Sequence, residues 1–153
     1  MSTPTIPASY RIFFTTIDPL LALTGFISAL FVPTAIVGTH LPVSGQEPPA
    51  ETTFLLQTLA GFYLALLVLE VYLLRVRPHD LTIWRALEFS LLLTDFFLVG
   101  ATAKWLGAEG GLNPLFWGLG EVGAIALTAG LGVIRVLFII GVGMRSGTGV
   151  KSA

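Results

Sequence analysis

Residues 83–105 read IWRALEFSLLLTDFFLVGATAKW. The stretch is long enough to cross the hydrocarbon of a bilayer as one helix, for which about 20 apolar residues suffice. It nevertheless contains two carboxylates, Glu88 and Asp95, each of which costs roughly 2.5 kcal/mol or more at the centre of a span. Their seven-residue spacing places them on one helix face, about 10.5 Å apart along the axis. The stretch therefore predicts a membrane helix whose polar face turns away from lipid.

The rest of the chain repeats this character, with apolar segments of spanning length at 18–38, 53–74 and 113–142. Hydrophobic residues make up 54% of the 153 residues and charged residues 11%, against about 25% charged in soluble domains. We therefore predict an all-α fold, with one transmembrane domain over residues 1–153. In it, four helices at 18–38, 53–74, 83–105 and 113–142 form a bundle around a polar cavity.

Charge, cysteine and histidine content exclude several function classes. The formal net charge of −1 offers no basic surface, so no nucleic-acid partner is expected. The absence of cysteine removes disulfides, thiol catalysis and thiolate metal ligands. His40 and His79 lie in connections at opposite ends of the predicted bundle, so we expect no metal site. The run from Gly118 to Gly123 matches a dinucleotide fingerprint but lacks the strand that this motif follows, so no cofactor is expected.

Proline positions predict where helices begin and bend. Asp18-Pro19 and Asn113-Pro114 each pair an N-cap side chain with proline at the first helical position, so we interpret Asp18 as a cap. Pro33 predicts a kink in the first span. The fourth segment is longer than a bilayer requires and should tilt or protrude.

The distribution of basic residues predicts the orientation in the membrane. One side collects the N-terminus, the second connection and the C-terminal tail, with Arg11, Arg75, Arg77, Arg85, Arg145 and Lys151. By the positive-inside rule, both termini are cytosolic. Lys104 is the exception on the opposite side.

Polar residues recur at intervals of seven on two other helices. The second carries Tyr63 and Glu70, and the fourth carries Glu121, Thr128 and Arg135. Trp84 and Thr102 extend the stripe of the third. Three helices thus each have one polar face, and such faces turn into a bundle because lipid cannot solvate them.

Counting from the connections predicts two polar layers. Asp95 and Glu121 fall within about 5 Å of the same depth, which makes them candidates for a catalytic carboxylate pair. Glu70, Glu88 and Arg135 fall nearer the cytosol and form a second cluster that would tune the first.

Two carboxylates in a site of low dielectric do not ionise together easily, so one would act as an acid and the other as a base. Such a pair can open an epoxide, by activating water or a substrate hydroxyl on one side and protonating the epoxide oxygen on the other. It can also move a double bond, with aromatic rings shielding the cation. We predict that substrate contacts come from Tyr63, as a hydrogen-bond donor, and from Trp84, Trp117 and Thr128.

Structural roles compete with these interpretations. Glu88 and Arg135 would equally form an ion pair that fixes helix register. Asp95 and Glu121 would equally bond to a threonine hydroxyl or a backbone carbonyl. Trp117 would equally be an interfacial anchor.

The order of certain residues resembles a known group. They are Tyr10-Arg-Ile-Phe-Phe with Asp18-Pro19, Leu69-Glu70 before Arg75, Ile83-Trp84-Arg85 before Thr94-Asp95-Phe96, Trp117-Gly118, and Arg135 before Gly143. Over nearly the whole chain this order resembles a family of small fungal four-helix membrane proteins, mostly of unassigned function. In that family a histidine often stands where this chain has Leu98, and an asparagine often stands near Glu121.

The resemblance implies a function in the endoplasmic reticulum. Members look similar to proteins encoded with fungal polyketide and terpenoid pathways, including hydrolases or cyclases that open polyketide epoxides. The plan also looks like the sterol-isomerase and sigma-2-receptor superfamily, in which acids from neighbouring helices line a pocket.

Three hypotheses follow. The first is an acid–base enzyme of fungal secondary metabolism that opens or cyclises an epoxide on a lipophilic substrate. An acid–base isomerase that moves a double bond in such a substrate is the alternative reaction. The second is a protein that binds sterols or other lipophiles without reaction. The third is a small carrier, which would have to oligomerise to enclose a pathway. The expected partners are a lipophilic small molecule, the bilayer and, in a homodimer, a second copy.

Overall fold

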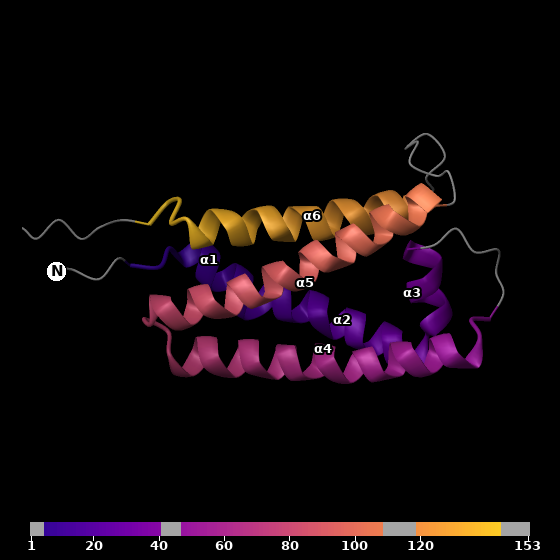
Figure 1. Ribbon diagram of the computed structural model, residues 1–153. Coiled ribbons are helices and arrows are strands. Elements are labelled where there is room, and N and C mark those ends of the chain that lie inside the picture. The colour runs from indigo at the N-terminus through magenta and orange to yellow at the C-terminus, as the bar shows by residue number, and fades with distance from the viewer. Residues whose placement is uncertain (1–4, 41–46, 109–118, 145–153) are drawn as a thin grey trace, which may run out of the picture.

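The computed structural model describes residues 5–40, 47–108 and 119–144. Within these ranges the chain forms helices and no strand. The elements are α1 (Ala8–Ile12), the π-helical turn η1 (Phe13–Ile17), α2 (Asp18–Phe31), α3 (Pro33–His40), α4 (Ala50–Val76), α5 (Leu81–Ala108) and α6 (Leu119–Ile139). Figure 1 shows the long helices running side by side. Four stretches, Ala8–Phe31, Ala50–Val76, Leu81–Lys104 and Val122–Ile139, are long and apolar enough to cross a membrane. The protein is therefore an all-α, four-helix integral membrane bundle.

The first span begins ten residues before the predicted start at residue 18, because α1, η1 and α2 are continuous from Ala8 to Phe31. The interpretation of Asp18 as a helix cap is therefore wrong. Its backbone is helical, with φ −60° and ψ −48°, and its N–H bonds to the carbonyl of Phe13. This wider π-helical spacing makes room for the ring of Pro19, which would otherwise clash with a carbonyl of the preceding turn.

Pro33 breaks the first span instead of kinking it. Val32 leaves the helical region, with φ −135° and ψ 60°, because a residue before proline is pushed out of the α conformation. Helix α3 then starts at Pro33 and runs across the end of the bundle (Figure 1).

Helices α4 and α5 contain the predicted spans 53–74 and 83–105 and extend beyond both ends of each, whereas α6 ends before the predicted end at residue 142. Helix α5 begins after Asp80, whose Oδ1 accepts the backbone N–H groups of Thr82 at 3.1 Å and Ile83 at 3.2 Å. Helix α6 ends at Ile139, before a turn in which Gly141 and Gly143 have φ of 84° and 77°. Asn113-Pro114 lies outside the described residues.

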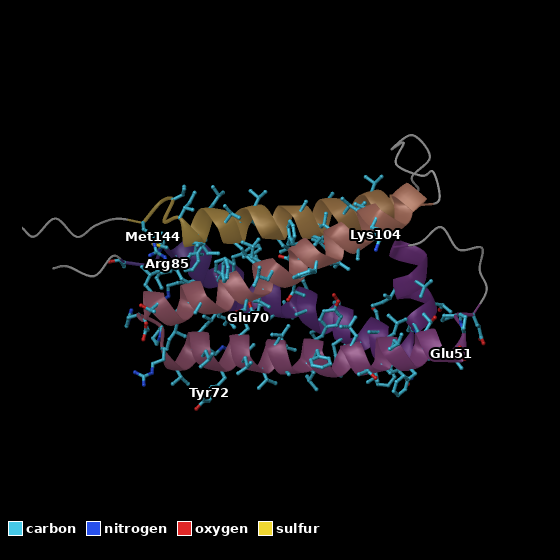
Figure 2. The ribbon with its side chains drawn as sticks, in the orientation of Figure 1. Glu51, Glu70, Tyr72, Arg85, Lys104 and Met144 are labelled. Carbon is cyan, nitrogen blue, oxygen red and sulfur yellow. The ribbon has the colours of Figure 1, made fainter. Side chains whose placement is uncertain are left out.

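Helix α2 packs along α4, and α5 packs along α6. One end of the bundle is filled by four buried residues, one from each span, which we call the apolar plug: Phe14, Leu74, Trp84 and Phe138. The rings of Phe14 and Phe138 meet edge to face with centroids 5.1 Å apart. Figure 2 shows Glu70 directed from α4 into the bundle and Tyr72 directed away from it. The apolar plug therefore closes this end of the bundle, next to the buried polar residues of the four spans.

Candidate functional site

Each span carries one buried ionisable residue about one helical turn from its plug residue. Asp18 follows Phe14 and Glu88 follows Trp84 by four residues, whereas Glu70 precedes Leu74 by four and Arg135 precedes Phe138 by three. We call this set the charged layer: Asp18, Glu70, Glu88 and Arg135. None of the four is more than 4% exposed. The layer therefore lies inside the bundle and directly on the plug.

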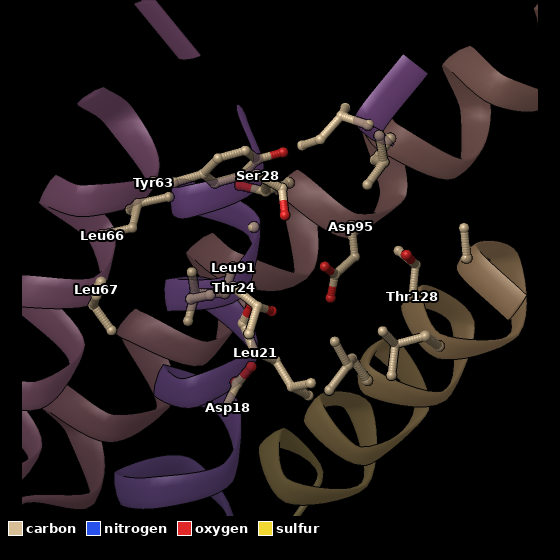
Figure 3. A pocket seen from close by; sticks show the side chains of 18 of the residues that line it. Asp18, Leu21, Thr24, Ser28, Tyr63, Leu66, Leu67, Leu91, Asp95 and Thr128 are labelled. Atoms are coloured by element: carbon tan, nitrogen blue, oxygen red, sulfur yellow. The ribbon is translucent and has the colours of Figure 1, made fainter. Parts of the chain in front are cut away.

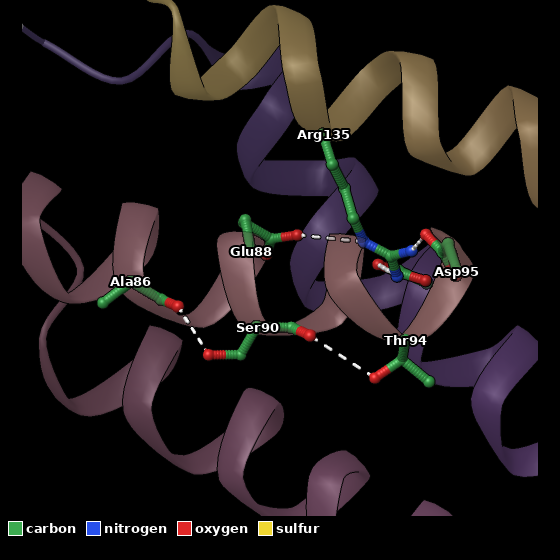
Figure 4. A network of polar contacts seen from close by, with 7 residues as sticks. Ala86, Glu88, Ser90, Thr94, Asp95 and Arg135 are labelled. Carbon is green, nitrogen blue, oxygen red and sulfur yellow. Dashed lines mark hydrogen bonds and ion pairs between the residues drawn. The ribbon is translucent and has the colours of Figure 1, made fainter. Parts of the chain in front are cut away.

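Arg135 holds three carboxylates through the three nitrogens of its guanidinium (Figure 4). Its Nη2 lies 2.6 Å from Oδ2 of Asp18, and its Nε lies 3.3 Å from Oε2 of Glu88. Its Nη1 pairs with Oδ2 of Asp95. The planar fork of arginine suits this use because it presents donors in several fixed directions. Arg135 thus joins α2, α5 and α6 at one point.

The carboxylates outnumber the cation at this point. Asp18, Glu88 and Asp95 pair with the one guanidinium, and Glu70 lines the same cavity. Among the described residues, Oε1 of Glu70 and Oε1 of Glu88 have no hydrogen-bond partner. Burial of an uncompensated anion costs several kcal/mol. The cluster therefore requires protons on some carboxylates or a cationic or hydrogen-bond-donating ligand.

A second level lies on every span seven residues farther from the plug than the charged layer, about 10.5 Å away from it. We call it the cavity layer: Gly25, Tyr63, Asp95 and Thr128. All four residues line a cavity of about 470 Å³. Figure 3 shows Tyr63, Asp95 and Thr128 directed into this space. Asp18, Glu70 and Arg135 also line it, so the charged layer forms its floor.

Apart from these polar groups, the cavity walls are largely aliphatic, with Leu21, Leu66, Leu91, Leu98, Leu127 and Leu131. The side chain of Asp95 is 16% exposed, whereas those of Asp18 and Glu88 are 3% and 0% exposed. Asp95 is therefore the carboxylate of the arginine cluster that is most open to a bound molecule. At Gly25 an added Cβ would meet nothing within 4 Å, so this glycine leaves space in the cavity.

Arg135 bridges the two predicted layers, since it contacts both Glu88 and Asp95. A long helical side chain leans toward the N-terminus of its own helix. Arg135 therefore reaches from the charged layer of α6 toward the cavity layer, where Asp95 lies. The predicted partner Glu121 belongs to α6, but its side chain lies outside the described residues, as does Trp117.

The predicted substrate contacts lie in different places. Tyr63 and Thr128 line the cavity. Trp84 instead lies in the plug, 0% exposed, with its indole N–H donating to the carbonyl of Arg77 at 3.0 Å. Thr102, which is predicted only to extend the polar stripe of α5, is buried, and its hydroxyl donates to the carbonyl of Leu98 at 3.0 Å.

Asp18 is the site residue that sequence reasoning missed. Its signal was the apolar run Ile12-Phe13-Phe14 one turn before it, which extends the span to its N-terminal side. An acid within such a run occupies the interior of a span rather than its end.

A family model matches residues 3–145. The chain belongs to the DUF7704 family, a domain of unknown function. No curated protein and no solved structure matches the chain. The DUF7704 match covers all four spans and every residue of the charged layer and the cavity layer.

Proposed function

We propose that this DUF7704 protein is a membrane-embedded enzyme that uses its carboxylates as acid and base on a lipophilic substrate. Opening or cyclisation of an epoxide on a polyketide or terpenoid is the preferred reaction. The observation that carries the proposal is Asp95, a carboxylate held by Arg135 at the wall of a largely aliphatic cavity within the spans.

In this proposal Asp95 is the base. Arg135 pairs with it and orients it, and the carboxylate keeps lone pairs that can accept a proton. Asp95 takes the proton of a water or a substrate hydroxyl, whose oxygen attacks one epoxide carbon while the bond from that carbon to the epoxide oxygen breaks. Attack by water yields a diol, and attack by the hydroxyl yields a cyclic ether.

The epoxide oxygen needs a proton donor. Glu70 is suited to this role because it lines the cavity and its Oε1 has no hydrogen-bond partner among the described residues. Tyr63 would donate a hydrogen bond from the cavity layer. Glu121, seven residues from Thr128 on α6, stays a predicted second acid. The same groups would serve the isomerisation of a double bond.

The cavity suits a lipophilic substrate. Its volume of about 470 Å³ lies in the range of roughly 300–1,000 Å³ that is usual for small-molecule sites. Aliphatic walls lower the local dielectric, which strengthens every electrostatic interaction inside. Entry from the bilayer would deliver such a substrate without passage through water.

The resemblance to fungal secondary-metabolism proteins supports a fungal enzyme in the endoplasmic reticulum. The exposed arginines Arg75 and Arg77 near the end of α4 support an orientation with both termini in the cytosol. A homodimer stays a prediction.

A non-enzymatic binding protein is the second candidate, and the excess of carboxylates favours it. A cationic lipophile would supply the positive charge that the cluster lacks, with Glu70 as an available acceptor. Such a protein binds its ligand in the same cavity and releases it unchanged.

The test is to incubate membranes that contain the protein with lipophilic epoxides and to detect diols or cyclic ethers by mass spectrometry. We expect Asp95→Asn to lower turnover roughly 100-fold or more, because the amide cannot accept the proton. Glu51→Gln, an exposed acid in the first turn of α4, is the matched control. Full turnover by Asp95→Asn would remove the assignment, and saturable binding without product would favour the second candidate.

A further inference from the structure

A second hollow lies on the outside of the bundle, away from the cavity layer. It is a groove of about 600 Å³ between the first span and α4. One wall consists of Thr15, Thr16, Pro19, Leu20 and Leu23, and the other consists of Leu67, Val68, Val71, Tyr72, Arg75 and Val76. On both walls the residues recur with the spacing of one helix face. Figure 2 shows Tyr72 directed outward from α4, on the side that would face lipid.

Most of the groove is apolar and exposed. Leu20 is 57% exposed and Val68 is 56% exposed. From Leu67 to Arg75 the groove runs about 12 Å along α4. A protein that spans a bilayer covers such a hollow with lipid tails, because water does not reach this surface.

Its polar groups gather at one end. Helix α4 has 27 residues and is about 40 Å long, whereas the hydrocarbon is about 30 Å thick, so the last turn of α4 reaches the level of the lipid headgroups. Arg75 lies in that turn, is exposed, and makes no ion pair or hydrogen bond within the described part of the chain. Thr16 faces the same groove from the π-helical turn.

The hydroxyl of Thr16 is also available to donate a hydrogen bond to a ligand in the groove. Those of Thr15 and Thr94 each donate to a carbonyl of their own helix, at 2.7 Å and 3.3 Å. Thr16 has no such bond within the described residues. The wider π-helical turn and the charge of Arg75 thus bring unused donors to the headgroup end of an apolar groove.

We propose that this groove binds one anionic glycerophospholipid, with an acyl chain along Leu20, Val68 and Val71 and the phosphate at Arg75 and Thr16. An aliphatic wall with a cation at headgroup depth matches a lipid at both of its ends. The site is independent of the proposed reaction, since the groove and the cavity share only Leu67.

Native mass spectrometry of the full chain in detergent, with added phosphatidylglycerol or phosphatidylcholine of identical chains, tests the proposal. We expect one retained phosphatidylglycerol per chain and weaker retention of phosphatidylcholine. Arg75→Gln should lower phosphatidylglycerol binding roughly five- to tenfold. Arg77→Gln removes the same charge two residues later, outside the groove, and should leave binding within about twofold.

Val71→Trp should lower the binding of both lipids by filling the groove. Circular dichroism and thermal unfolding will show whether each variant keeps its fold. Equal losses in Arg75→Gln and Arg77→Gln, or equal retention of the two lipids, would overturn the proposal. So would release of the lipid by inorganic phosphate, or a dimer of this chain that buries the groove in place of lipid.

Discussion

Arg135 is the residue on which the site depends. Its guanidinium pairs with acids from α2 and α5 while its own backbone belongs to α6. Asp18, Glu88 and Asp95 are thus all stabilised inside the bundle by the charge of Arg135. Removal of one charge at this position therefore changes the environment of three carboxylates together.

We expect Arg135→Met to destabilise the bundle by about 3–5 kcal/mol, because it leaves buried carboxylates without a partner. Thermal unfolding in detergent measures the loss. Arg77→Met, which removes an exposed arginine, should change stability by less than about 0.5 kcal/mol. A stability of Arg135→Met equal to that of Arg77→Met would contradict the role of Arg135 as the counter-ion.

Gly25 controls the space above the charged layer. Because an added Cβ there meets nothing within 4 Å, we expect Gly25→Leu to fold with near-normal stability and to fill part of the cavity. Substrate turnover, or ligand binding under the second candidate, should fall at least tenfold. Gly61→Leu, at an exposed position of α4 outside the cavity, is the matched control. Equal activity of the two variants would argue against use of this cavity.

At the scale of elements, chain breaks define the site more than helix lengths do. Because the π-helical turn η1 lets the helix continue through Pro19 without a break, Asp18 lies within the first span and belongs to the charged layer. The break at Val32 ends α2 and turns α3 across the bundle, where Ala35 and Ile36 line the cavity. Both features follow from the missing N–H and the fixed ring of proline.

The turn after α6 gives a further test. Gly141 has φ of 84°, and an added Cβ would lie 3.2 Å from Nη2 of Arg85, whereas Gly143 has φ of 77° with open space. We expect Gly141→Ala to lower stability by about 1–2 kcal/mol through backbone strain, with a further loss where Arg85 must shift. Gly143→Ala should show the strain alone, and Gly100→Ala, inside α5, should show neither loss. Identical unfolding temperatures for all three variants would contradict the strained turn.

At the scale of the whole molecule, the four spans found in the described residues place residues 5 and 144 on the same side of the membrane. The proposed orientation puts the connection after α4 in the cytosol. The chain has no cysteine, so a single introduced cysteine reports one position without background.

In sealed microsomes, we expect His79→Cys to react with a membrane-impermeant maleimide directly. Glu51→Cys, in the first turn of α4 at the opposite end of the span, should react only after detergent is added. The reverse pattern would invert the orientation, and direct reaction of both would contradict a spanning α4.

The sequence by itself determined the fold class and which polar residues share a face of each helix. Apolar segments of spanning length identify four membrane helices, because a helix is the structure that satisfies its own backbone in lipid. Spacing of seven places Glu70 below Tyr63, Glu88 below Asp95 and Arg135 below Thr128, because this interval nearly repeats a helix face.

Only the tertiary structure decided which of these groups meet. Arg135 contacts Asp95, Asp18 joins the same cluster, and Trp84 packs in the plug instead of lining the cavity. All three outcomes depend on the axial offsets between helices and on the directions of the side chains. The periodicity of one helix carries no information about its axial shift against a neighbour. That shift is set by packing between helices, here by the four residues of the plug and by the break before Pro33.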